Sequence, residues 1–218
     1  MGPIANFSFD HGWYYIYRVH LEKLAELKTK FSELHSYLSL INDKCPNSYF
    51  SNGPRASKLK FNMPFEIYST KNHELSLLAK HAIDFYKGRY KSNHAKVEVF
   101  LLEHDAKTVA VEVPLWFEPE EMKPFSKILD TKKPLTGHID ILQVEDDKIW
   151  IWDYKSDVDK EPYAATQTFF YAMMLSKRTG IPIENFRCGF FDDSTAHFFE
   201  PRTIAEELEK KAVTAYKT

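Results

Sequence analysis

The feature that most constrains the fold of this chain is a pair of β-rich runs around a short acidic turn. The runs span residues 136–144 and 149–155, and β-branched and aromatic residues on both sides of a polar turn are typical of a β-hairpin. A turn centred on the Asp-Asp pair at 146–147 places Asp140 directly opposite Asp153. Opposed residues hold their Cβ atoms about 4.5–5.5 Å apart, so two carboxylates there repel each other. The hairpin must therefore offset this repulsion.

The neighbours of the two acids are apolar, which is typical of a strand that is covered on both faces. A buried pair of carboxylates is costly unless it is paired or bound to a metal, and divalent cations take hard oxygen ligands. The pattern therefore predicts a metal site at Asp140 and Asp153. The alternative is an ordinary hairpin with acids facing solvent, which a register shift of one residue would produce. The apolar neighbours are Ile139, Ile141, Ile149, Trp150, Ile151 and Trp152.

Three polar residues further along the chain are candidate partners of these acids. Lys155 lies two residues after Asp153, so we expect it on the same face of the strand. Gln167 and Tyr171 are four residues apart and share one face of a predicted helix. A strand-edge lysine, a surface glutamine and a core tyrosine are the alternatives, because the helix is apolar around most of its circumference.

Taken together, three motifs resemble those of the PD-(D/E)XK nucleases, specifically the RecB-like exonuclease branch. They are Gly137-His-Ile-Asp140, Asp153-Tyr-Lys155 and Gln167-Thr-Phe-Phe-Tyr171. The resemblance covers roughly residues 81–192, and its specificity comes from the third motif, since the two acidic motifs alone occur by chance. The resemblance implies an α/β fold with a restriction-endonuclease-like αβββαβ core, in which helices flank a mixed central sheet. It also implies a divalent-metal-dependent deoxyribonuclease.

The resemblance also implies a role for each motif. Asp140 and Asp153 would hold one or two Mg²⁺ or Mn²⁺ ions, with the main-chain carbonyl of Tyr154 as a further ligand. Lys155 would orient the attacking water or neutralise developing charge. The glutamine and tyrosine of the third motif would position that water, the lysine and the substrate backbone. Such groups are needed because negative charge builds on the phosphoryl oxygens during hydrolysis.

The same resemblance points to two more metal ligands. Glu112 is the single acid in an apolar run at 109–115, just before an apolar-Pro-Leu step where RecB-like nucleases place a glutamate. It would bind the metal directly or support a ligand, and an outward-facing strand residue is the alternative. His81 lies in a predicted helix at 72–90, where the family often carries a metal-binding histidine.

Three other residues near these motifs stay open as alternatives. Glu74 and Asp84 lie on the same predicted helix and could replace His81 as ligands. His138 is expected to be a non-ligating residue that faces Lys155.

Periodicity and turn residues divide the chain into an N-terminal helical cap at 1–60, which narrows the cleft, and a nuclease core at 61–218. The expected elements are helices at 10–41, a loop at 45–64, a helix at 72–90, strands at 96–103 and 107–117, an insertion at 118–134, the hairpin, a helix at 161–179 ending at Gly180, two strands around 192–195 and a helix from Ile204.

Composition excludes several classes of protein. The only cysteines, Cys45 and Cys188, cannot supply the four thiolates of the iron–sulfur cluster that related CRISPR-associated nucleases often carry. The sequence has no apolar run of about 18 residues and no signal-peptide pattern, so we expect an intracellular, cytoplasmic protein without a membrane span.

The net charge of −2 says little about partners, but basic residues cluster locally. Such clusters could follow a phosphate backbone, although many are simply solvated faces. The clustered residues are Lys87, Arg89, Lys91, Lys96, Lys123, Lys127, Lys132 and Lys133.

These observations predict a DNA nuclease, most simply an exonuclease for single-stranded or free ends in repair, recombination or CRISPR-type processing, with protein partners in such a complex. One alternative is a nucleic-acid-binding module that has lost activity on a nuclease scaffold. Another, unrelated to DNA, is a hairpin protein that a metal stabilises.

Overall fold

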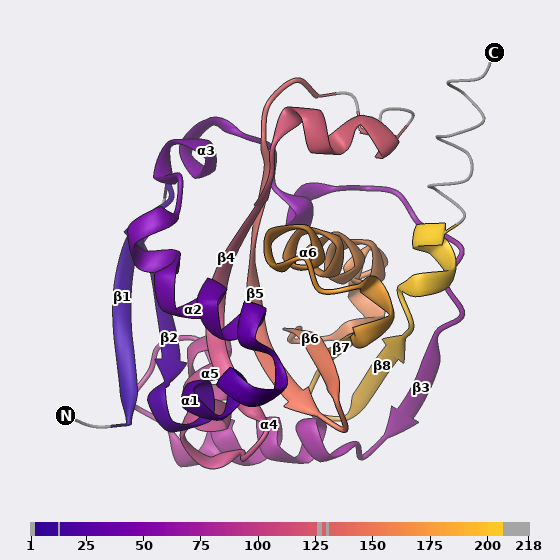
Figure 1. The fold of residues 1–218 in the computed structure, drawn as a ribbon. Helices are drawn as coiled ribbons and strands as arrows, with labels where there is room; N and C mark the ends of the chain where they lie inside the picture. The colour runs from indigo at the N-terminus through magenta and orange to yellow at the C-terminus, as the bar shows by residue number, and fades with distance from the viewer. Residues whose placement is uncertain (1–2, 13, 126–127, 130, 207–218) are drawn as a thin grey trace.

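The computed structural model describes residues 3–12, 14–125, 128–129 and 131–206. Within them one mixed eight-stranded sheet runs in the order β1-β2-β4-β5-β6-β7-β8-β3, and only the β6–β7 pair is parallel (Figure 1). The strands are β1 (Ile4–Asp10), β2 (Tyr14–His20), β3 (Tyr68–Lys71), β4 (Thr108–Phe117), β5 (Leu135–Glu145), β6 (Lys148–Tyr154), β7 (Phe186–Phe191) and β8 (Thr195–Phe199).

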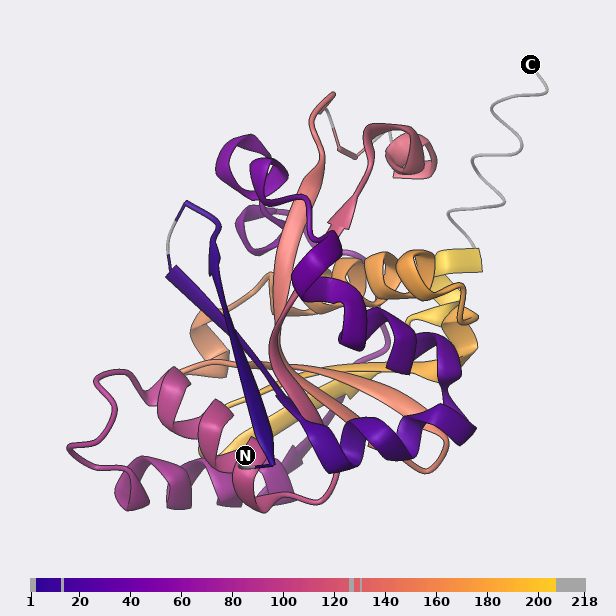
Figure 2. The same cartoon turned by 60° about the vertical axis from the view of Figure 1, so that its left-hand side comes forward.

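Helices cover both faces of this sheet. Figure 2 shows α4 and α5 in one layer and α6 with α1 and α2 in the other. Each layer encloses its own apolar cluster of buried side chains. The helices are α1 (Leu21–Lys30), α2 (Ser32–Lys44), α3 (Asn47–Asn52), α4 (Glu74–Phe85), α5 (Asn93–His104) and α6 (Ala164–Thr179), with short 3-10 turns at Ala56–Lys58, Pro119–Phe125, Val158–Lys160 and Ile183–Asn185. The α/β fold class is thus as predicted.

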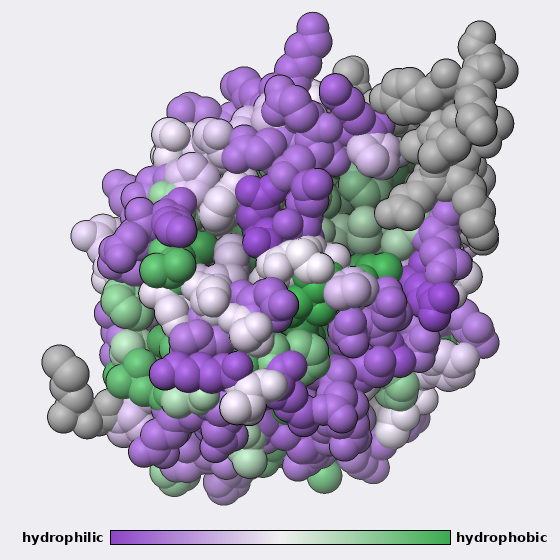
Figure 3. Space-filling model, in the orientation of Figure 1, coloured by the Kyte–Doolittle hydropathy of each residue, from purple (hydrophilic) through white to green (hydrophobic). Residues whose placement is uncertain are grey.

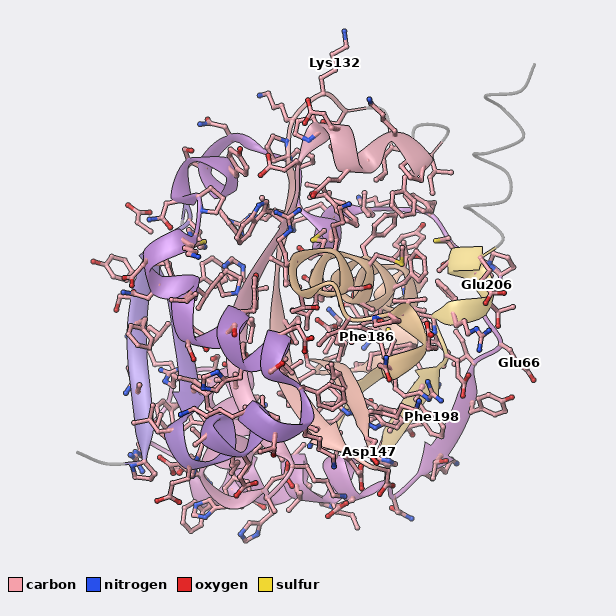
Figure 4. All side chains as sticks on the ribbon, viewed as in Figure 1. Glu66, Lys132, Asp147, Phe186, Phe198 and Glu206 are labelled. Carbon is pink, nitrogen blue, oxygen red and sulfur yellow. The ribbon has the colours of Figure 1, made fainter. Side chains whose placement is uncertain are left out.

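The central hairpin is β5–β6, and its predicted register is confirmed. Glu145 pairs with Lys148 and Ile141 with Trp152, which continues to Asp140 opposite Asp153. The two turn residues both have positive φ, 48° and 58°, as a type I′ turn requires. The side chain of Asp147, at the tip, lies at the far end of β5 from Lys132 (Figure 4).

The prediction of helices at 10–41 is wrong for its first part. Ile4–Asp10 and Tyr14–His20 form the antiparallel β1–β2 pair, and β2 joins the central sheet through Arg18 and Val19, which pair with β4. Aromatic and β-branched residues at alternate positions suit a strand, and Tyr17 and Val19 are buried while Tyr14 and Ile16 are exposed. From Leu21 the predicted helices are present as α1 and α2. The division at residue 60 stays a prediction.

The strand predicted at 96–103 is also wrong, because these residues belong to α5. Six consecutive residues from Val97 to Leu102 are buried, so this helix has apolar contacts around its whole circumference and shows no 3.6-residue period. The first core strand is therefore β4, and α5-β4-β5-β6-α6-β7 supplies the αβββαβ order.

The other predicted elements are present with shifted ends. The helix at 72–90 is α4, the helix at 161–179 is α6, and the strands around 192–195 are β7 and β8. Gly180 ends α6 with a φ of 77°, a left-handed value that glycine adopts without strain. The last helix is present up to residue 206, and the rest of that prediction lies outside the described residues. No helix in the described ranges is long and apolar enough to cross a bilayer.

The front surface of the molecule is mostly hydrophilic, with apolar side chains reaching it in separate hollows (Figure 3). A cavity of about 420 Å³ lies between α2, β4 and the end of α6, away from the predicted motifs. It is lined by Glu33, Ser36, Tyr37, Leu40, Ile41, Lys44, Trp116, Arg178 and Thr179.

Candidate nuclease site

A smaller cavity of about 240 Å³ brings together most of the predicted site residues. It opens where the middle of β4 and β5, the end of β6, the start of α5 and the first turns of α6 meet. Its lining residues are Tyr15, Arg55, Ser57, His94, Glu112, Gly137, His138, Asp140, Asp153, Lys155, Gln167 and Tyr171.

Asp140 joins β5 to α5 and to the end of β6. Its Oδ2 lies 2.6 Å from Nε2 of His94 and accepts a 3.0 Å hydrogen bond from the main-chain N–H of Tyr154. The residue is 8% exposed, so this carboxylate is held in place by fixed partners rather than by water. Tyr154 thus touches the site through its N–H, and a role for its carbonyl stays a proposal.

Asp153 is the centre of a second network, which reaches α6. Its Oδ2 lies 2.6 Å from Nζ of Lys155, and its Oδ1 accepts a 2.6 Å hydrogen bond from Nε2 of Gln167. The amide oxygen of Gln167 accepts from Lys155 at 3.2 Å, and its nitrogen is 3.0 Å from the hydroxyl of Tyr171. The third motif therefore orients the second, since one glutamine side chain contacts the acid, the lysine and the tyrosine.

Gly137 provides the space in which Tyr171 lies. A Cβ built on this glycine would overlap the Tyr171 ring at Cε1. The first motif therefore needs a glycine three residues before Asp140 for a steric reason, because the tyrosine ring packs directly on the backbone of β5.

Glu112 lies in β4 with a φ of 52°, an unfavourable left-handed value for a residue with a side chain. Such a conformation costs roughly 1–3 kcal/mol and persists only where the surroundings impose it. It interrupts the alternation of the strand, since Val111 packs on the α4–α5 side and Val113 on the α6 side. The interruption is what brings the Glu112 side chain into the lining of the cavity.

The structure places a different histidine from the predicted one at the site. His81 is exposed on α4, where its ring contacts Phe85 and Phe100. Its alternatives are also outside the cavity lining, since Glu74 pairs with Lys107 and Asp84 is exposed. Two histidines line the cavity: His94, in the first turn of α5, contacts Asp140, whereas His138 contacts His11 instead.

Sequence reasoning missed both His94 and its neighbour Glu98. Potential ligand atoms of these two residues and of Asp140 all lie within 4.8 Å of one another. Glu98 is 3% exposed, and its Oε1 has no hydrogen-bond partner in the described residues, with Nε2 of His94 4.0 Å away. The available signal was their spacing of four residues, which places both side chains on one face of a helix. The strand predicted at 96–103 hid this signal, because residues four apart have no such relation across the start of a strand.

Burial and mutual repulsion perturb the acids of this site. Burial, together with the charge of Asp140, raises the pKa of Asp153 to about 7, and burial raises the pKa of Glu98 to about 7. Burial and the charge of Glu98 raise the pKa of Glu112 well above its ordinary value. Only Asp140 moves the other way: burial opposes its ionisation, but His94 and Lys155 outweigh burial and lower its pKa.

The pKa values of the two cationic side chains, His94 and Lys155, are also raised, which favours their charged forms. Burial acts to lower the pKa of His94, but the charge of Asp140 and the hydrogen bond to it raise that pKa to about 10. Burial likewise acts against the charge of Lys155, but Asp153 and Asp140 raise its pKa. Both side chains are therefore held in their charged forms by the acids.

These residues fit a divalent cation. Four carboxyl groups, those of Glu98, Glu112, Asp140 and Asp153, surround two cationic side chains. Three of the four have raised pKa values, and Glu98 presents an oxygen that no hydrogen bond satisfies. Rich in oxygen and partly unsatisfied, this donor set suits Mg²⁺ or Mn²⁺, with one imidazole in reach.

Comparison with known proteins agrees with this geometry. The chain matches the PD-(D/E)XK nuclease superfamily over residues 64–215, which is most of its length, and it therefore belongs to that superfamily. A comparison with curated proteins finds no match. The superfamily consists of nucleases, which generally depend on divalent metals, so membership implies a hydrolytic enzyme that acts on nucleic acid.

Proposed function

We propose that this protein is a divalent-metal-dependent deoxyribonuclease that degrades single-stranded DNA from free ends. The observation that carries the proposal is the convergence of Asp140, Asp153 and Lys155 in one cavity, each fixed by a buried partner. Membership of the nuclease superfamily supports the reaction class. The polymer, the end requirement and a place in repair, recombination or CRISPR-type processing are our inferences.

Asp140 and Asp153 would hold the metal, with Glu112, the Tyr154 carbonyl and His94 as the remaining candidates. His94 takes the part that the resemblance assigned to His81, because it is the histidine beside Asp140. When bound, a divalent cation lowers the pKa of water and polarises the phosphate. Glu98, next to His94, would orient the imidazole or bind the ion itself.

The remaining side chains place the reactants. Lys155 carries a positive charge between Asp153 and Gln167, where it can neutralise charge that develops on the phosphate or orient the attacking water. Gln167 contacts both that ammonium and the Asp153 carboxylate, and Tyr171 fixes Gln167. In this proposal Asp140 and Asp153 would hold the metal that activates the water, and the neighbouring Lys155 would stabilise the developing charge.

The preference for a single strand rests on the N-terminal segment. Tyr15 from β2 and Arg55 from the loop after α3 both line the cavity and narrow it. A cavity of about 240 Å³ with walls on several sides accepts one strand more readily than a duplex.

The test is cleavage of labelled DNA by wild type and by Asp153→Asn in the presence of Mn²⁺. We expect the variant to lose about a thousandfold in rate, because a metal ligand supplies several kcal/mol of charge stabilisation. Asp159→Asn is the matched control, since Asp159 is an exposed acid outside the cavity.

The substrates separate the finer points. Linear single-stranded DNA should be cut faster than duplex DNA or RNA, and a closed single-stranded circle should survive. Equal cutting of the circle would rule out a need for ends. A wild type that binds DNA but cuts nothing would instead favour an inactive binding module.

A further inference from the structure

Part of the cavity wall comes from residues that precede the superfamily match, which begins at residue 64. Tyr15, Arg55 and Ser57 line the same cavity as Asp140 and Lys155. These three residues therefore lie outside the matched part of the chain, and Arg55 is the one that carries charge.

The backbone of Arg55 is fixed beside the first motif. Arg55 forms a parallel bridge to Thr136, and the N–H of Thr136 donates a 2.9 Å hydrogen bond to the carbonyl of Pro54. Thr136 immediately precedes Gly137 in β5. The loop that carries Arg55 therefore pairs with the start of β5, beside the opening of the cavity.

The side chain of Arg55 is fixed as well. Its guanidinium donates to the hydroxyl of Tyr15 and to the carbonyl of His11. The Tyr15 ring stacks on His138 with a centroid distance of 3.9 Å and an interplanar angle of 8°. His138 in turn is 2.8 Å from His11, which is 2.9 Å from Asn47. An aromatic block, made of the rings of His11, Tyr15 and His138, therefore holds the guanidinium at the cavity wall.

All of these partners of Arg55 are neutral. In the described part of the chain no carboxylate lies within 4.0 Å of its guanidinium nitrogens, whereas Arg178 pairs with Glu121 and Arg187 with Glu200. Burial and the charge of Arg55 also lower the pKa values of His11 and His138, so this block adds no counter-charge. A guanidinium has five N–H donors, and the two contacts with Tyr15 and His11 do not exhaust them.

We propose that Arg55 binds a phosphate of the substrate strand next to the phosphate that is hydrolysed, with the Ser57 hydroxyl as a second donor. The proposal rests on the proposed function, because it takes a polynucleotide as the substrate. The planar fork of arginine matches two phosphate oxygens, and a fixed fork loses little freedom on binding. In the proposed function Asp140, Asp153 and Lys155 act on the phosphate that is hydrolysed. The guanidinium of Arg55 is therefore assigned to the adjacent phosphate of the strand.

The first experiment measures binding without cleavage. Fluorescence anisotropy of a labelled single-stranded oligonucleotide in Ca²⁺ compares wild type, Arg55→Gln and Arg55→Lys. We expect Arg55→Gln to weaken binding about ten- to hundredfold, as the loss of charged hydrogen bonds predicts, and Arg55→Lys to lie between. Arg187→Gln is the matched control, because it removes the same charge from a residue outside the cavity lining.

The second experiment locates the phosphate. In each substrate one phosphodiester is replaced by an uncharged methylphosphonate, and kcat and KM are measured in Mn²⁺. At one position beside the cut we expect a higher KM for wild type but no further increase for Arg55→Gln, since the two changes remove the same contact. Substrates with a terminal phosphate or a terminal hydroxyl show whether this phosphate is internal or terminal.

The outcomes separate this inference from the proposed function. If wild type cuts DNA and Arg55→Gln binds and cuts like Arg187→Gln, the role of Arg55 is refuted and the nuclease stands. If wild type cuts nothing but binding still depends on Arg55, the nuclease is refuted and the phosphate contact stands. If wild type neither binds nor cuts, both are refuted.

A purely structural role for Arg55 is tested separately. Thermal unfolding of each variant reports folding, and Ser57→Ala changes the cavity without touching the contacts of Arg55 to Tyr15 and His11. If Arg55→Gln does not fold, Arg55→Lys and Ser57→Ala carry the test. Equal affinity of both with wild type would then refute the phosphate contact.

Discussion

Replacing Gly137 by alanine should disable the site without touching any acid. The new methyl group would overlap the ring of Tyr171, which packs on the glycine and holds Gln167. Overpacking of this kind costs about 1–3 kcal/mol. At roughly 2–4 °C per kcal/mol for a chain of this size, the melting temperature should fall by about 2–12 °C.

The activity should fall further than the stability. If the ring moves by about 1 Å to relieve the overlap, Gln167 loses its fixed position beside Asp153 and Lys155, and a displacement of that size can reduce the rate about a hundredfold. Circular dichroism melting gives the stability, and cleavage of linear single-stranded DNA well below the melting temperature gives the activity of the folded enzyme.

Two further variants make this prediction refutable. Gly88→Ala is the control, because Gly88 has a positive φ that alanine rarely adopts but a Cβ there meets nothing within 4 Å, so this variant should lose stability and keep activity. Combining Gly137→Ala with Tyr171→Ala should recover part of the stability, because the smaller side chain removes the overlap. A Gly137→Ala enzyme with wild-type melting and wild-type activity would refute the steric argument.

Three other changes have defined outcomes. Glu98→Gln removes a buried acid with an unsatisfied oxygen, so it should raise the melting temperature of the metal-free protein. It should also reduce the extra stabilisation that Mn²⁺ gives, and a thermal-shift assay measures both effects. An unchanged Mn²⁺ effect would exclude Glu98 from the metal site. Lys23→Met removes the half-buried ammonium that donates to three carbonyl oxygens and should cost about 1–3 kcal/mol in urea unfolding, and a neutral result would contradict a stabilising role for these hydrogen bonds. Burial opposes the charge of Asp192, but hydrogen bonds from Val158, Ser194 and Thr195 outweigh it and lower its pKa below 3.8, so its stabilisation is complete above that ordinary value and is lost as pH falls toward the folded pKa. Asp192→Asn should therefore differ from wild type in unfolding free energy near neutral pH, and this difference should shrink as pH falls below 3.8 toward the lowered pKa of Asp192; a constant difference would contradict the shift.

The hairpin could be predicted from the sequence because its determinants are local. Two β-rich runs and an Asp-Asp turn fix the register within about twenty residues of chain, and the positive φ of both turn residues is the type I′ geometry that such a turn requires. The partners on α6 could also be predicted, since Gln167 and Tyr171 follow from helical spacing once the motif is located.

The rest of the site could not be predicted, because its determinants are not local. His94 and Glu98 lie on a helix whose burial on all sides removes the period that would mark it as a helix. Arg55 and Tyr15 reach the cavity from a loop and a hairpin more than eighty residues before Gly137, and only pairing with β4 and β5 brings them there. Glu112 could be named from the family resemblance, but the left-handed backbone conformation that brings it into the cavity lining could not be predicted from its neighbours in sequence.

The position of the site in the sheet explains why so many of its features are unfavourable by themselves. Buried carboxyl groups, a left-handed glutamate and an arginine without a counter-ion each lower the stability of the free protein. Two apolar layers, one on each face of the sheet, offset these costs and keep the acids from rearranging to relieve their repulsion. The site contains charges of both signs. The acids favour the binding of a cation, and Arg55 at the cavity wall favours the binding of an anion. A polyanionic strand that arrives with a divalent ion satisfies both needs at once, so metal and substrate should stabilise the protein more together than the sum of their separate effects.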